Sequence, residues 1–447
     1  MEPARTARRP SGMRYGVRTS LGLLAAACVA VTSAGCASAP APRPAQPVPV
    51  ARGVAAIEPA ADPRPLAAAD TAFGLTLLRA WCAQYPGRNL VFSPSTLATS
   101  LGMAYLGARG ATAGVMARVL HLPAASGPAL AAQLQARSRT LSRLDGPGVT
   151  LAASNQVWAD PTLPALPAYL NAVATGYFAG VAQAPFGTSP RRAADEINQS
   201  ISQATRGHIT RIVTPDMLAG IGWVLTAALY MDAAWDTPFD PNETGPGTFT
   251  PGGGARPVTA KYLNGAGFQF AAASGWTAVS LPYKGGKLSM TALLPPAGSG
   301  SCALPSQAGL GALAGALRVS GGSAAARAAR LAAVALPKVN LSTGGSFGQM
   351  GPVLERLGMG LAFTPSADFS ALSPNACCIG FVQQAATLQV GEKGTVAAAA
   401  AATGVVPTSG IAVARRIVFD RPYLMLVTDT ATGEPLFLAE VANPTAS

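Results

Sequence analysis

Histidine, lysine and acidic side chains are all scarce in this chain, and these shortages exclude several kinds of catalytic chemistry. The 447 residues include two histidines, five lysines and 20 acidic residues, and only 12% are charged, about half the usual share. His121 and His208 both lie where helices are expected to end, which favours structural roles. No lysine follows a serine by three positions, and no Gly-x-x-x-x-Gly-Lys phosphate loop occurs. We therefore expect a protein that is not an enzyme.

An exported hydrolase is the alternative on the enzyme side. One Gly-x-Ser-x-Gly match runs from Gly344 to Gly348. A nucleophile elbow of that kind needs a histidine later in the chain, whereas both histidines come earlier. A Gly/Ser-rich loop explains the match better. Paired carboxylates need no fixed spacing, so they are the one route to hydrolysis that the sequence leaves open.

The six cysteines give no metal-binding pattern, because no Cys-x-x-Cys pair and no neighbouring histidine occurs. We predict no metal and no cofactor. Cys302 lies in a Gly/Ser loop and could form a disulfide, but its spacing does not say with which partner. The adjacent Cys377 and Cys378 are interpreted as packing residues rather than a vicinal bridge. Cys82 belongs to the same expected domain.

The net charge of +12 is not interpreted as a nucleic-acid signal. Nearly all the positive charge is arginine, and part of it lies in the first 35 residues. No dense basic stripe with interleaved aromatic residues is present. We therefore predict a solvated basic surface and no nucleic-acid partner.

Residues 1–36 have the order of an export signal. Arg8-Arg9 belong to a positive region, Leu21 to Thr32 is apolar, and the small residues Ser33 to Gly35 precede Cys36. The arrangement resembles a bacterial lipoprotein signal, in which Cys36 becomes the lipidated first residue. A plain secretory signal is the alternative. We expect a protein anchored on the extracellular side of the cell membrane, or secreted.

Residues 37–66 are rich in proline and alanine and have no apolar period, which predicts a semi-extended tether. The remaining residues, 67–447, are expected to form one large domain. Helical patterns cluster early and strand patterns late, which favours an α+β fold over alternating units. Helices are expected over Asp70–Cys82 with Asp70 as N-cap, Ser95–Leu106 after Ser93-Pro94, Arg109–Leu120, Pro167–Ala179, Arg191–Arg206 and Met350–Leu357. Strands are expected over Trp223–Met231, Trp276–Leu281, Leu288–Leu294, Ala332–Leu336, Phe381–Val390, Tyr423–Thr428 and Leu436–Val441.

The most informative stretch, residues 391–421, lies between two expected strands. It contains Gly394-Thr395-Val396 and then six alanines, Ala397 to Ala402. Taken alone, this run indicates a short helix or a low-complexity linker.

Its surroundings resemble the serpin family of protease inhibitors. Glu392-Lys393-Gly394-Thr395 with the alanine run is similar to the family's hinge, and further similar motifs follow in family order across about residues 67–447. These are Asn89-Leu90-Val91-Phe92-Ser93-Pro94, Gly107-Ala108-Arg109-Gly110-Ala111-Thr112, Tyr230 to Trp235 with Pro238-Phe239, Leu281-Pro282-Tyr283-Lys284-Gly285, Leu357-Gly358-Met359, Ala367-Asp368-Phe369-Ser370, Phe419-Asp420-Arg421-Pro422-Tyr423, and Phe437 to Val441 with Asn443-Pro444.

The resemblance implies an α+β serpin-like fold with three β-sheets, about eight or nine helices and an exposed reactive-centre loop near residues 391–421. It also implies a monomer whose partner is a serine protease. That protease attacks the loop and becomes an acyl-enzyme, and the loop then inserts into the central sheet. We expect an irreversible suicide-substrate inhibitor. A non-inhibitory binding or chaperone-like protein on the same fold is the alternative.

The hinge sequence suits insertion. In an inserted strand alternate residues share one face, here Thr395, Ala397, Ala399, Ala401 and Thr403. All are small enough to enter beside a packed interior. The expected hinge comprises Glu392, Gly394, Thr395, Val396, Ala397, Ala398, Ala399, Ala400 and Ala401.

Two counts locate the reactive bond differently. Counting roughly fourteen residues from Gly394 gives Thr408-Ser409, which we prefer. Counting back from Pro422 gives Ile411-Ala412. The small residues near Thr408 predict an elastase-like or subtilisin-like target.

The resemblance also implies an opening region beneath the central sheet. Its expected members are Ser93, Thr96, Trp235 and Gln384. The family's asparagine and histidine partners are replaced here by Ala227 and Gln384. Losing both partners of a buried hydrogen bond can be nearly neutral, and Gln384 is expected to bond to Ser93 instead.

Overall fold

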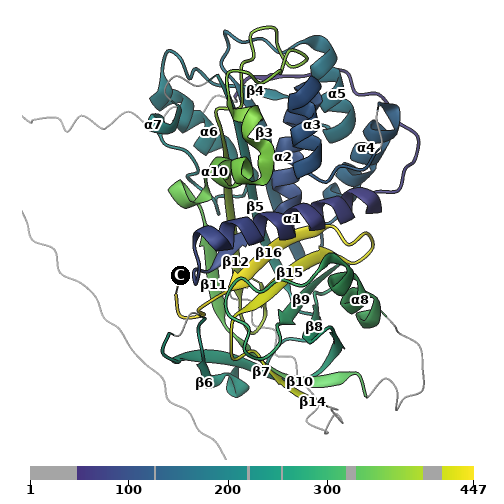
Figure 1. Ribbon diagram of the computed structural model, residues 1–447, viewed down its shortest axis with the longest axis vertical. Coiled ribbons are helices and arrows are strands. Elements are labelled where there is room, and N and C mark those ends of the chain that lie inside the picture. The colour runs from purple at the N-terminus through teal and green to yellow at the C-terminus, as the bar shows by residue number, and fades with distance from the viewer. Residues whose placement is uncertain are drawn as a thin grey trace, which may run out of the picture. The chain divides into compact units, whose positions relative to one another are not determined.

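Three β-sheets and the helices that cover them make up the part of the chain that the structure describes (Figure 1). The computed structural model describes residues 48–124, 127–218, 222–252, 255–318, 329–395 and 415–446. The export signal with Cys36, the hinge residues Val396 to Ala401 and both candidate bonds, Thr408-Ser409 and Ile411-Ala412, lie outside the described residues. No helix within these ranges has the length and apolar character that crossing a membrane requires.

Local signals placed most of the helices correctly. Five of the expected helices are present as α1 (Arg64–Gln84), α2 (Pro94–Gly107), α3 (Gly110–Val119), α5 (Pro167–Tyr177) and α6 (Pro190–Ala204). The sequence analysis missed α4 (Pro128–Ser142), α7 (Pro215–Leu218) and α8 (Gln307–Leu317). Short helical segments cover α10 (Gly351–Leu354), Pro241–Glu243, Gly345–Gly348, Glu355–Met359 and Gly360–Phe363.

The two helix starts that the sequence analysis named have different outcomes. Ser93 caps α2 as expected, because its hydroxyl accepts a hydrogen bond from the Thr96 N–H at 3.2 Å. Asp70 is not an N-cap, since α1 begins six residues earlier at Arg64. Asp70 lies buried inside the helix and pairs with Arg137. Its tertiary partner, which no local pattern reveals, decides its role.

The central sheet has seven strands in the order β1-β4-β3-β5-β13-β12-β11. β5 and β12 run parallel and pair directly from Val224 and Phe381 to Leu229 and Ala386. Beyond that point the two-residue strand β13 lies between them. The strands are β1 (Val50–Ala51), β3 (Val149–Ala159), β4 (Val181–Gln183), β5 (Trp223–Ala234), β11 (Val339–Thr343), β12 (Phe381–Val390) and β13 (Gly394–Thr395).

The other two sheets share one long strand, β7 (Val258–Ala273), and so form a continuous nine-stranded ladder. The first half of β7 pairs with β6, its last residues pair with β8, and β10 spans the residues between. The α+β class and the three expected sheets are thereby confirmed. The remaining strands are β2 (Leu90–Phe92), β6 (Gly245–Phe249), β8 (Trp276–Pro282), β9 (Leu288–Leu294), β10 (Leu331–Pro337), β14 (Arg415–Val418), β15 (Tyr423–Asp429) and β16 (Pro435–Val441).

The last part of the expected tether is packed on the domain. Val50 and Ala51 pair with β4 as an edge strand of the central sheet. Farther on, the Val54 N–H donates to Asn171 Oδ1 at 2.8 Å, and the Gln135 side chain donates to the Ala56 carbonyl at 2.8 Å. Residues 48–63 therefore belong to the folded unit, which corrects the tether boundary at residue 66.

Side chains of β5 alternate between two apolar layers. Leu225, Leu229 and Ala233 face the clusters formed with the helices around α2 and with the neighbouring sheet. Val224 and Ala228 face the cluster that contains Ile197 and Ile201 of α6. Any strand added beside β5 in register would follow the same alternation.

Candidate functional site

The central sheet is parted at one end of β5 and β12, and two residues fill the gap. Gly394 pairs with Ala234, Thr395 pairs with Ala233 on one side, and Thr395 pairs with Val390 on the other. These two residues are the first of the alanine-rich segment, so the chain enters the sheet where that segment begins.

Gly394 is required by the close approach of the neighbouring strand. A Cβ built on Gly394 would lie 2.1 Å from the carbonyl oxygen of Ala233 and 2.8 Å from Cα of Ala234. Both are backbone atoms that cannot rotate away, so no larger residue fits without moving the strand.

Thr395 is fully buried, and its hydroxyl lies 2.6 Å from the hydroxyl of Tyr283. Burial raises the pKa of Tyr283 above its ordinary value, so the phenol stays protonated as a donor or acceptor. Tyr283 in turn stacks on Trp235 with ring centroids 4.5 Å apart. Trp235 fixes the residues just before Gly394. Its Nε1–H donates to the Gly391 carbonyl and its backbone N–H donates to the Lys393 carbonyl, both at 2.9 Å.

Glu392 fixes the turn before Gly394. Its two carboxylate oxygens each accept from Lys338 Nζ at 2.8 Å, and one also accepts from the Thr244 hydroxyl at 3.1 Å. Partial burial alone would raise its pKa, but the Lys338 and Thr244 hydrogen bonds hold the pKa of Glu392 below the ordinary value. We call Trp235, Tyr283, Lys338, Glu392, Gly394 and Thr395 the opening site.

Beneath the paired part of β5 and β12, Gln384 takes over the polar contacts. Its Nε2 donates to the Ser93 carbonyl at 3.0 Å and lies 3.3 Å from the Thr96 hydroxyl. Its partner across the ladder is Ala227. The expected contact with Ser93 is therefore present, although it reaches the backbone oxygen, because the Ser93 hydroxyl already caps α2.

The structure thus brings the expected residues together in two groups. Trp235, Glu392, Gly394 and Thr395 meet at the parted end, and Ser93, Thr96 and Gln384 meet beneath the closed part. The sequence analysis gave no role to Tyr283, Lys338 and Thr244. The scarcity of lysine, with five in the chain, was the available signal for Lys338. Nothing in the sequence paired Lys338 with Glu392.

Comparison with known proteins identifies this architecture. A family model described as "Serpin (serine protease inhibitor)" matches residues 68–444. The chain belongs to the serpin family. Serpins are generally protease inhibitors rather than catalytic enzymes.

Curated relatives of this serpin come from distant organisms. It is 29% identical over 371 residues to a serpin-like protein of Thermococcus kodakarensis, covering 80% of this chain and 81% of the relative. It is 29% identical over 410 residues to serpin-ZXA of Oryza sativa subsp. japonica, covering 86% and 99%. It is 27% identical over 389 residues to a serine protease inhibitor of Rattus norvegicus, covering 85% and 89%.

Solved structures agree with the fold. The native state of the thermophilic serpin tengpin matches with a TM-score of 0.72 at 22% identity, covering 89% of this serpin and 100% of tengpin. Human thyroxine-binding globulin matches with a TM-score of 0.72 at 23% identity, covering 86% and 100%. At these identities the likeness establishes the fold alone.

Proposed function

We propose that this serpin is an inhibitory member that traps serine proteases by inserting the segment after Thr395 between β5 and β12. The observation that carries the proposal is the register of β13. Gly394 and Thr395 are already paired with β5, and Thr395 is paired with β12. Insertion would extend a ladder that has begun.

Extending that ladder gives one register from both sides. Continuing the pairing of Thr395 with Ala233 brings Ala401 opposite Ala227, and continuing its pairing with Val390 brings Ala401 opposite Gln384. Ala227 and Gln384 are themselves partners in the present sheet. The two strands therefore agree on where each residue of the new strand would lie.

Small side chains suit the buried face of this register. Thr395 already points inward, and Ala397, Ala399, Ala401 and Thr403 would follow it. The layer beneath is filled by apolar side chains of β5, β12 and α2, so a larger side chain would overpack it by about 1–3 kcal/mol. Ala401 would pass over Gln384 without a clash of long side chains.

The length of strand that fits between β5 and β12 supports Thr408-Ser409 as the reactive bond. β5 has 12 residues and begins at Trp223, so the extended register ends with Val405 opposite Trp223. Pro407 has no N–H and could not continue a ladder. The bond after Thr408 would then lie just past the end of the sheet. A protease attached at Thr408 would therefore be carried along the full length of the inserted strand.

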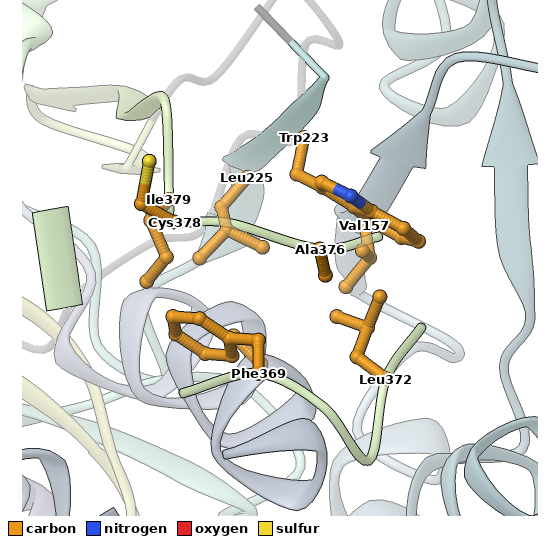
Figure 2. A pocket seen from close by; sticks show the side chains of 9 residues that line it. Val157, Trp223, Leu225, Phe369, Leu372, Ala376, Cys378 and Ile379 are labelled. Atoms are coloured by element: carbon orange, nitrogen blue, oxygen red, sulfur yellow. The ribbon is translucent and has the colours of Figure 1, made fainter. Parts of the chain in front are cut away.

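A small apolar pocket lies at the end of β5 where Trp223 stands. Figure 2 shows Trp223, Leu225 and Val157 on one side of it and Phe369 and Leu372 on another, with Ile379 and Cys378 nearby. Val405 would enter the sheet beside Trp223 with its side chain on this inner face. The last inward side chain of the inserted strand would therefore pack against the lining of this pocket.

Covalent trapping of an elastase-like or subtilisin-like protease tests the proposal. We expect the full chain to form a complex that survives denaturing electrophoresis, and a released peptide that starts at Ser409. A peptide starting at Ala412 would support the second count. Cleavage without a complex would contradict inhibition and favour the non-inhibitory alternative.

The insertion step is tested by a matched pair of variants. Thr395→Arg would bury a charge at the position from which the new strand is extended, so we expect cleavage with no complex. Thr395→Ser keeps a hydroxyl facing Tyr283 and should trap the protease as before. Equal complex yields from the two variants would overturn the insertion role of Thr395.

We also propose that the protein is exported, lipidated at Cys36 and held as a monomer on the extracellular side of the membrane. The order of charged, apolar and small residues before Cys36 supports this. Labelled fatty acid should be incorporated into the expressed protein and be lost in Cys36→Ser. Equal labelling of the two would contradict the anchor.

A further inference from the structure

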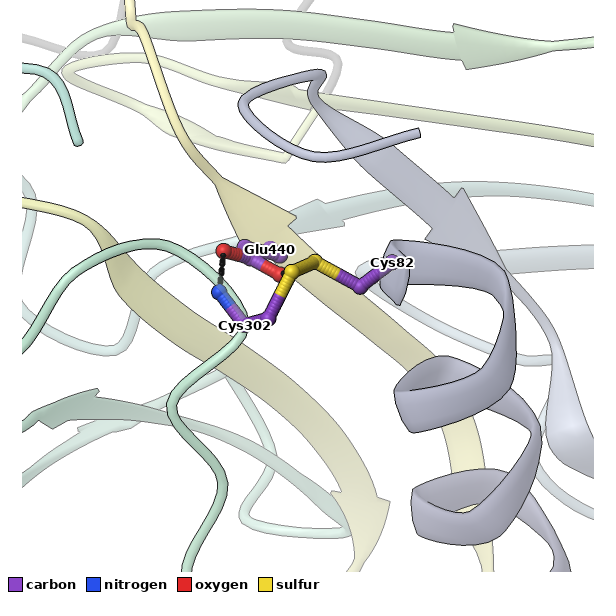
Figure 3. The surroundings of a disulfide bond; sticks show 3 residues. All are labelled: Cys82, Cys302 and Glu440. Atoms are coloured by element: carbon purple, nitrogen blue, oxygen red, sulfur yellow. Dashed lines mark hydrogen bonds between the residues drawn. A yellow bond between two sulfur atoms is a disulfide. The ribbon is translucent and has the colours of Figure 1, made fainter. Parts of the chain in front are cut away.

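Three residues from distant parts of the chain meet at a disulfide. Cys82 of α1 is bonded to Cys302 in the loop before α8, and Glu440 of β16 lies against the bond (Figure 3). Glu440 Oε1 accepts from the Cys302 N–H at 2.6 Å, and Oε2 lies 3.0 Å from Cys82 Sγ. One donor atom from each residue lies within 4.8 Å of the other two.

The carboxylate of Glu440 is poorly satisfied beside a disulfide. Glu440 is 1% exposed, and no basic side chain in the described ranges forms an ion pair with it. A disulfide sulfur has no hydrogen, so Cys82 donates nothing to Oε2. A buried carboxylate with a single backbone N–H partner is costly, which suggests that this oxygen has another ligand in some state of the protein.

The backbone of Cys302 has an uncommon conformation beside Glu440. Its φ is +69°, in the left-handed region that residues other than glycine rarely occupy. The hydrogen bond from its N–H to Glu440 helps to hold this conformation. Backbone conformations of this kind persist where the surroundings enforce them, and they are frequent at ligand sites.

We propose that reduction of the Cys82–Cys302 disulfide converts these three residues into a zinc site. Two thiolates and one carboxylate are a donor set that Zn²⁺ accepts. In tetrahedral coordination, with Zn–S near about 2.3 Å and Zn–O near about 2.0–2.2 Å, ligand atoms lie about 3.3–3.8 Å apart. Glu440 Oε2 already lies 3.0 Å from Cys82 Sγ, and the two sulfurs would move apart to this spacing once their bond is broken. A water would complete the shell from the side of Cys302, which is partly exposed.

The reduction step is a thiol–disulfide exchange with an external dithiol. The dithiol supplies two electrons and two protons and closes its own disulfide, while the bond between Cys82 and Cys302 breaks and both become thiols. Zinc then displaces the two thiol protons to solvent and binds both sulfurs and Glu440. Sequence spacing could not indicate this site, because Cys82 and Cys302 are 220 residues apart and Glu440 lies a further 138 residues along the chain.

Cobalt, a coloured substitute for zinc, tests the site in the full chain. Serine should replace Cys28, Cys36, Cys377 and Cys378, so that only the two proposed ligand cysteines remain. After reduction and anaerobic removal of the dithiol, we expect one equivalent of Co²⁺ to bind, with thiolate-to-cobalt absorption in the near ultraviolet that added Zn²⁺ abolishes. The oxidised protein should show neither. Absence of this absorption in the reduced protein would overturn the proposal.

The role of the carboxylate is tested by Glu440→Gln, with Glu392→Gln as the matched control at a different site. Glu440→Gln should weaken zinc binding by about tenfold or more, since loss of an outer-shell partner alone costs about that much, and Glu392→Gln should not change it. Equal affinities would contradict the assignment of Glu440.

Because reduction could loosen the fold, the thermal midpoint of the reduced parent is the second measurement. Zinc should raise it, and no rise would also overturn the proposal. The opening site shares no residue with this cluster, so failure here leaves protease trapping untouched.

Discussion

Charged residues are arranged very differently in the opening site and in a second group, which we call the anchor cluster, made of Asp70, Arg137 and Glu434. In the anchor cluster Arg137 pairs with Asp70 and, at 3.0 Å, with Glu434, and all three side chains are at most 5% exposed. In the opening site, Lys338 and Glu392 are 35% and 19% exposed. Both groups contain good ion pairs, but only one is sealed from water.

The anchor cluster joins helices α1, α2 and α4 to the start of β16. Arg137 of α4 also donates to the Thr99 hydroxyl and the Ser95 carbonyl of α2, each at 2.8 Å, and Glu434 precedes β16. Burial raises the pKa of Asp70 well above its ordinary value, and the nearby Glu434 adds to the effect. A buried network of this kind is costly to break, whereas water can replace a partner in a half-exposed pair. This difference is the one expected if the opening site, and not the anchor cluster, rearranges during the proposed insertion.

Arg137→Met should have the largest effect. Removing the cation leaves two buried carboxylates without their partner, whereas the Thr99 hydroxyl and the Ser95 carbonyl keep their hydrogen bond to each other at 2.7 Å. We expect a loss of about 3–5 kcal/mol in the free energy of unfolding, measured by urea denaturation. Arg192→Met removes an exposed arginine that pairs with Glu196 on one helix face and should stay within about 0.5 kcal/mol. Similar losses of unfolding free energy in the two variants would contradict the stated difference between buried and exposed ion pairs.

Glu440→Gln should sharpen the comparison in the oxidised protein, because Glu440 is buried and no basic side chain in the described ranges forms an ion pair with it. Burial raises the pKa of Glu440 to about 7, although the Cys302 N–H partly opposes this. The folded state then binds more protons than the unfolded state, so stability falls as pH rises from about 4.5 to about 7. The fall is at most about 3 kcal/mol. The amide variant should lack this fall when thermal midpoints are compared at pH 5 and pH 8. Parallel profiles would show that Glu440 is not the titrating group.

Gln384→Leu tests the polar contacts beneath the closed part of the sheet. It leaves the Ser93 carbonyl and the Thr96 hydroxyl without their Gln384 partner in the core, at a cost of about 1–2 kcal/mol. Gln389→Leu, on an exposed position of the same strand, should change stability by less than about 0.5 kcal/mol. If urea denaturation gives equal losses, Gln384 has no special role in closing β5 on β12.

Lys338→Met should have the smallest effect, about 1 kcal/mol or less, because the pair is partly exposed and screened. The pKa of Glu392 is lowered in the folded state, so the contribution of the pair is present above the ordinary glutamate pKa and is lost as pH falls below it. In thermal melts, wild type and variant should therefore differ at neutral pH and converge as the pH falls below the lowered pKa of Glu392. Lys261→Met, at an exposed lysine, is the control and should match wild type throughout.

Much of the fold followed from local signals. The strand expected over Phe381–Val390 has the same bounds in the structure, because its Phe, Val and Thr residues favour strands even though three glutamines interrupt the apolar pattern. Ser93 followed by Pro94 marked the start of α2 correctly. Helix α4 was missed because its buried face includes Gln135 and Arg137, which break the apolar period that predicts a helix. Their partners, the Ala56 and Thr175 carbonyls, Asp70 and Glu434, come from elsewhere in the chain.

The features of the candidate site also divide into those that the sequence predicts and those that only the fold brings together. The sequence by itself determined that a small-residue segment follows a glycine hinge, since side-chain size and glycine are written into each position. Only the tertiary structure decided that Thr395 meets Tyr283, that Glu392 meets Lys338, and that Cys82, Cys302 and Glu440 converge. Each of these contacts joins residues far apart in the chain, and their distance is set by how helices and sheets pack rather than by any local preference.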